Sequence, residues 1–200
     1  RELALAGIEF ARTNSYPDGT TDDYFPFERA MGALVFSLYA MTETCLELEE
    51  KPDRFLDFFR LRGDWLLRHN ETGKLANHQA FAALALYKVY LLTGDASYKR
   101  GSEAFRDLTL SWGKSEGWFQ EYEGTDPGYH SCLISFFAKL WQKSNDPKIK
   151  EAMKMVSTSG SRFTVFALVD ALTRISGRIR NAGDRAELDS RIGRLLALAV

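Results

Sequence analysis

The segment "MGALVFSLYAMTETC", residues 31–45, shows most clearly which fold the sequence encodes. Its apolar residues recur every three or four positions, as on one face of an α-helix. They are Met31, Leu34, Val35, Leu38, Met41 and Cys45. Similar stripes occur within 58–65, 80–91, 98–112 and 133–141, whereas almost no segment alternates with the period of two that a β-strand requires. The sequence therefore predicts an all-α fold.

Connections of two kinds join the predicted helices. Short ones, such as "LTGDAS" at 92–97, alternate with long, polar ones that contain glycine. The long connections are "PDGTTDDYFPFE" (17–28), "NETGKLANHQ" (70–79) and "EGWFQEYEGTDPGYH" (116–130). They begin near Asp18, Asn70 and Gly117, at spacings of 52 and 47 residues. A period of about fifty residues is typical of stacked helical hairpins.

The place of the long connections in this repeat favours one of two architectures. A superhelical solenoid would keep its loops short, whereas an α/α toroid gathers long loops at one end of the ring. We therefore expect an incomplete toroid of hairpins over residues 1–156. Residues 157–200 are expected to form further helices of the same domain, near 162–177 and 184–198. Both chain ends fall inside helical patterns, which predicts truncation at each end.

Composition excludes several classes of function. The formal net charge of -1 gives no indication of nucleic-acid binding, and no apolar run is long enough to predict a membrane span. The 3 histidines and 2 cysteines lack the spacing of a zinc site, and no glycine-rich phosphate loop occurs, so we expect neither metal nor cofactor. Cys45 and Cys132 are predicted to be buried thiols. No signal peptide is visible, so a periplasmic and a cytoplasmic location both stay open.

If the long loops converge, polar and aromatic residues about fifty positions apart would meet in one mouth. Carboxylates and amides beside aromatic rings suit a carbohydrate, because sugar C–H faces stack on rings while hydroxyls need fixed donors and acceptors. Tyr24 and Trp118 are the expected stacking platforms. The other candidates for substrate binding are Glu28, Arg29, Tyr122 and Asp126.

"ANHQAFAALAL" (76–86), followed by "EGWFQEYEGTDPGYHS" (116–131), resembles the helical toroid of heparinase II/III-like and alginate-lyase-like polysaccharide lyases. In those enzymes an Asn-His pair begins an inner helix and a tyrosine follows about one repeat later, which corresponds here to Asn77, His78 and Tyr129. The resemblance covers about residues 18–145. It also implies a β-rich domain beyond the C-terminal end of this chain, from which such lyases take a further histidine.

The resemblance implies β-elimination on a glycan that contains uronate. Asn77 and His78 would neutralise the uronate carboxylate and stabilise the enolate-like charge that develops. Tyr129 would remove the proton, protonate the leaving oxygen, or do both. As a base it needs a neighbouring positive charge, which His130 or Arg29 would supply. Tyr122 is the substitute for Tyr129.

Two other functions fit the same residues. Across 17–29, 70–78 and 116–130 there are nine acidic residues against Arg29 and Lys74, and a negative mouth repels polyuronates. A glycoside hydrolase with paired carboxylates, Asp23 or Glu28 with Asp126, would suit this charge better. The third alternative is a helical-repeat scaffold that binds sugar or protein without turnover.

Overall fold

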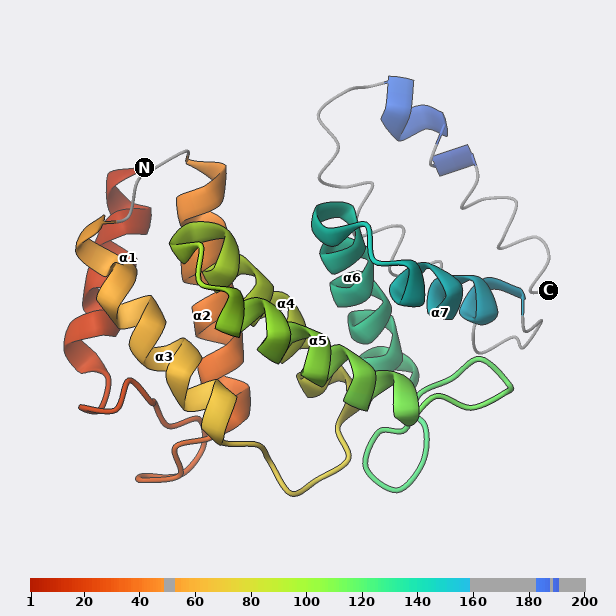
Figure 1. Cartoon of the computed structure of the whole chain (residues 1–200), viewed down its shortest axis with the longest axis horizontal. Helices are drawn as coiled ribbons and strands as arrows, with labels where there is room; N and C mark the ends of the chain where they lie inside the picture. The colour runs from red at the N-terminus through yellow and green to blue at the C-terminus, as the bar shows by residue number, and fades with distance from the viewer. Residues whose placement is uncertain (49–52, 159–182, 188, 191–200) are drawn as a thin grey trace. The chain divides into compact units, whose positions relative to one another are not determined.

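A computed structural model of the chain describes residues 1–48, 53–158, 183–187 and 189–190 (Figure 1). Within these residues every regular element is a helix, and the β-structure that they contain is limited to isolated bridges. The chain divides into two compact units, one of residues 1–73 with 81–107 and the other of residues 74–80 with 108–200. The all-α prediction is therefore confirmed.

The first unit contains α1 (Glu2–Asn14), α2 (Met31–Glu47), the short 3-10 helix η1 (Asp53–Phe55) and α3 (Leu56–Arg68). It also holds most of α4 (Ala76–Thr93) and of α5 (Ala96–Ser111). Helix α2 packs against both α1 and α3, and the three run side by side in Figure 1. The apolar stripe of α2 faces the core, where Leu34, Val35 and Leu38 are completely buried.

Small residues let α4 and α5 approach closely inside the first unit. Ala82, Ala83 and Ala85 of α4 are fully buried. The hydroxyl of Ser102 on α5 donates to the backbone oxygen of Ala83 at 2.6 Å. A Cβ on Gly101 would lie 2.2 Å from Cδ2 of Leu67, so no larger residue fits there without a shift.

The second unit contains α6 (Pro127–Ser144) and α7 (Pro147–Thr158), which pack against each other. Asp126 caps the start of α6, where Pro127 fits because the first helical residue needs no backbone donor. Asn145 ends the helix with a left-handed backbone, φ 53°. Residues 112–124 are tied back on themselves by the bridges Gly113–Phe119 and Glu121–Gly124.

Some expectations fall outside the described residues. The helix expected near 162–177 lies there entirely, as does most of the one expected over 184–198, although 183–187 and 189–190 are helical. Cys45 and Cys132 form no disulfide; Cys45 is buried as expected, but Cys132 is only partly so. No helix among the described residues is long and apolar enough to cross a membrane.

Candidate functional site

The second and third long connections meet in the second unit, although they lie far apart in sequence. Leu75 forms an antiparallel bridge with Glu121, and the backbone N–H of Ala76 donates to the oxygen of Gln120 at 3.2 Å. The segment that begins α4 is therefore held against the bridged segment before α6. This junction gives the candidate site its framework.

Glu121 lies at the centre of the junction and is only 2% exposed. Its Oε1 accepts the backbone N–H of Asn77 at 2.7 Å, and its Oε2 accepts the side-chain Nδ2–H of the same residue at 2.8 Å. Asn77 is itself 2% exposed, so one buried carboxyl satisfies two buried donors. This double contact fixes the start of α4, and with it His78, relative to residues 119–124.

Burial raises the pKa of the Glu121 carboxyl to about 7. The two hydrogen bonds from Asn77 and the charge of His78 act in the opposite direction, while the nearby charge of Asp126 adds to the rise. At neutral pH this carboxyl therefore exists in both protonated and ionised forms. Carboxyls with such a pKa serve as proton donors or acceptors in many active sites.

Two tyrosines lie beside this carboxyl. The ring centroids of Tyr122 and Tyr129 are 6.0 Å apart, and the side chains are 59% and 41% exposed. A hydrogen bond with Tyr129, together with burial and the charges of Glu121 and Asp126, raises the pKa of Tyr122. The phenol of Tyr122 therefore holds its proton more firmly than a free tyrosine and is a poor candidate for the base. Its backbone has φ 53°, a conformation that is strained for an aromatic residue.

His130 does not lie where its expected role requires. Its side chain is fully buried, with its ring 5.9 Å from that of Phe119 and nearly parallel to it. Burial lowers the pKa of His130 to about 4, so the ring is neutral near pH 7. A neutral imidazole cannot supply the positive charge that a tyrosine base needs. His78 is the histidine whose charge acts on the cluster.

Asp126 and Trp118 also belong to the second unit. The Oδ1 of Asp126 accepts the backbone N–H of Tyr129 at 2.8 Å and so fixes the first turn of α6. Trp118 is partly exposed, and the Nζ of Lys114 lies 5.9 Å from its ring centroid. This lysine places a positive charge beside a predicted sugar platform.

The remaining predicted residues belong to the first unit. Glu28 accepts the backbone N–H groups of Asp23, Tyr24 and Phe25 at 2.9–3.3 Å. Arg29 forms an ion pair of 2.8 Å with Asp18. Tyr24 is 82% exposed. Within this unit, therefore, Glu28 and Arg29 have structural contacts and Tyr24 presents an open ring.

Glu121 is the residue that sequence reasoning missed. It was counted only as one acidic loop residue, because an isolated glutamate has no distinguishing pattern. The structure shows an alternation that the residue types do not: Phe119 and Glu121 are 1% and 2% exposed, while Trp118, Gln120 and Tyr122 are less buried. This alternation has the period of an extended segment.

No protein-family model, no curated protein and no solved structure matches the chain. Among the described residues no group of three or more histidines, cysteines and acidic side chains is placed to hold a metal ion. A cavity among the described residues lies in the first unit, whereas the Glu121 cluster belongs to the second. The assignment of a function therefore depends on the geometry of the cluster itself.

Proposed function

We propose that the chain is an α/α-toroid domain of a carbohydrate-active protein, similar to polysaccharide lyases, that cleaves uronate-containing glycans by β-elimination. The observation that carries the proposal is the junction between Asn77 and Glu121. It joins the Asn-His pair to the segment that leads to Tyr129, and the carboxyl at its centre has a raised pKa and lies within the electrostatic influence of His78 and Asp126.

The exposed rings of this cluster give a sugar a surface on which to stack. Tyr122 and Tyr129 expose large parts of their side chains, and Trp118 is partly exposed. Lys114 beside Trp118 adds a positive charge that would attract a uronate.

The chemistry requires that the uronate carboxylate be neutralised before its α-proton is removed. Glu121 and Asn77 are each 2% exposed and bonded to one another, so they would position His78 rather than touch the substrate, and His78 would stabilise the developing negative charge. Tyr129 is then the group that removes the proton. Tyr122, which keeps its proton because its pKa is raised, would be the neighbouring O–H that hydrogen-bonds to the leaving oxygen.

The experiment is to incubate the protein with polyuronates and measure ultraviolet absorbance, since elimination creates a conjugated unsaturated uronate. We expect the wild type to produce this absorbance and Tyr129→Phe to lose at least about a hundredfold in rate. Tyr129→Phe should still bind the glycan. Tyr90→Phe, which alters a tyrosine of the first unit, is the matched control and should keep full activity. Undiminished turnover by Tyr129→Phe would contradict the assigned role.

A glycoside hydrolase is the second candidate, because Glu121 has the raised pKa that a general acid needs. Asp126 acts electrostatically on the same carboxyl and is the partner carboxylate in this case. A hydrolase would release new reducing ends without ultraviolet absorbance. Sugar binding without either product would instead favour the scaffold.

A further inference from the structure

Arg62 of α3 is a buried charge without a carboxylate partner among the described residues. Its side chain is 0% exposed. Its guanidinium donates to the backbone oxygen of Leu34 at 3.1 Å and to the hydroxyls of Ser37 and, at 3.4 Å, Ser15. All three acceptors are neutral, and the Nε has no hydrogen-bond partner. Burying a charge is costly unless an opposite charge compensates it.

A cavity of about 430 Å³ opens beside this arginine, entirely within the first unit. Ser15 and Phe58 line it, and both contact Arg62: Ser15 through the hydrogen bond and Phe58 with its ring centroid 5.2 Å from the guanidinium carbon. Leu61 extends the apolar part of the wall. The volume lies within the range of ordinary small-ligand sites.

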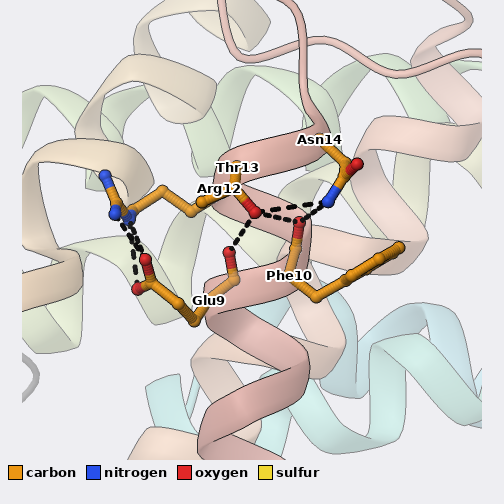
Figure 2. A network of polar contacts seen from close by, with 5 residues as sticks. All are labelled: Glu9, Phe10, Arg12, Thr13 and Asn14. Carbon is orange, nitrogen blue, oxygen red and sulfur yellow. Dashed lines mark hydrogen bonds and ion pairs between the residues drawn. The ribbon is translucent and has the colours of Figure 1, made fainter.

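Two further arginines line the cavity. Arg12, at the end of α1, is paired with Glu9, and Figure 2 shows its guanidinium turned toward that carboxylate while Phe10 points the other way. Arg54 lies with its guanidinium carbon 4.5 Å from the ring centroid of Phe55 and forms no ion pair with a described residue. Both arginines help to lower the pKa of Glu9, Arg12 through a hydrogen bond and Arg54 through its charge.

The balance of charge around the cavity is positive. Asp57 is the acidic residue of the lining, and its carboxylate is paired with Arg60 at 3.1 Å. Glu9 compensates one of the two lining arginines, which leaves one guanidinium at the rim and the buried one of Arg62 without an opposing charge. An anion in the cavity would face the guanidinium of Arg54 at the rim, with the buried charge of Arg62 behind the lining residues Ser15 and Phe58.

We propose that this cavity binds a small organic carboxylate, whose charged group pairs with Arg54 beside the Arg12–Glu9 ion pair and whose apolar body rests on Phe58 and Leu61. The planar guanidinium matches a carboxylate through two parallel hydrogen bonds, and a compact ring would fill the apolar part. The charge of Arg62 behind the wall would favour an anion over a neutral molecule of the same shape. The inference is independent of the lyase proposal, because it concerns other residues in the other unit.

The test is a calorimetric titration of the full chain with benzoate, with the neutral benzamide as its matched comparison. We expect benzoate to bind and benzamide to bind at least about tenfold more weakly. Arg54→Gln should weaken benzoate binding by about tenfold, because it removes a charge-assisted pair. Arg68→Gln, which alters an exposed arginine at the end of α3, should leave the affinity unchanged.

Arg12→Gln provides a second variant if Arg54→Gln misfolds, and the helical circular dichroism of each variant shows whether it has folded. Equal binding of benzoate and benzamide would overturn the proposal. So would a lack of benzoate binding by the wild type, or an affinity that falls as much in Arg68→Gln as in Arg54→Gln.

Discussion

The loop at residues 16–29 and the segment at residues 112–126 have similar composition but different structural roles. Each contains aromatic rings, several carboxylates and a non-glycine residue with positive φ. In the first loop the carboxylates hold the loop itself. Asp22 accepts the hydroxyl of Tyr16 and the backbone N–H groups of Phe27 and Arg29, all within the same loop. In the second segment Glu121 bonds instead to a residue 44 positions away.

This difference also appears in the acidity of the carboxyls. Hydrogen bonds, led by that from Tyr16, lower the pKa of Asp22, and backbone donors, led by that of Tyr24, lower the pKa of Glu28. Both carboxyls stay ionised at neutral pH. Burial raises the pKa of Glu121 to about 7. A count of acidic residues therefore does not distinguish the two segments, whereas the burial of one carboxyl does.

The largest expected effect on stability comes from removing the buried carboxyl. Glu121→Ala should lower the free energy of unfolding by about 3 kcal/mol at pH 5, because both donors of Asn77 lose their buried acceptor. Glu28→Ala should cost clearly less, since water can reach the exposed loop donors that it bonds. Urea denaturation of the two variants beside the wild type measures both losses. Equal losses would show that the two loops do not differ in the proposed way.

A smaller effect concerns pH. The unfolded carboxyl of Glu121 ionises near 4.5, whereas the folded one keeps its proton until about pH 7. The folded state therefore binds more protons in this interval, and its stability falls as pH rises through it. The loss should be on the order of 2 kcal/mol between pH 5 and 8.

Glu121→Gln removes this dependence, since an amide does not titrate here, while its oxygen still accepts the backbone N–H of Asn77. We expect the variant to be less stable than the wild type at pH 5, because its amide nitrogen cannot accept the Nδ2–H of Asn77, and to show no fall in stability between pH 5 and 8. Thermal denaturation across this range tests the expectation. Parallel stability curves for the two proteins would contradict it.

The helices were predictable because their apolar residues repeat at helical spacing and are buried for that reason, as in the Leu34, Val35 and Leu38 stripe. The contact between the start of α4 and the segment before α6 was predictable only in outline, as a convergence of loops. Which side chains would meet could not be read from the sequence. The partner of Asn77 is fixed by the bridge between Leu75 and Glu121, a tertiary contact that leaves no local pattern.

His130 illustrates the opposite error. It follows Tyr129 directly, but successive residues on a helix point in different directions, so one is 41% exposed and the other fully buried. Because His130 follows Tyr129 in the sequence, it was expected to supply a positive charge to that tyrosine. Both residues lie in the first turn of α6, and this turn directs their side chains to different sides of the helix.

The central claim is that one glycan binds where residues 75–78 and 119–129 meet. It is tested most directly by recording amide NMR spectra of the ¹⁵N-labelled protein during titration with an unsaturated oligouronate, a product that cannot be consumed further at the same bond. The account predicts that the backbone signals of Asn77, His78, Tyr122 and Tyr129 shift together with one dissociation constant. Shifts confined to residues 16–29, or signals of 75–78 that stay unchanged while those of 119–129 move, would contradict it.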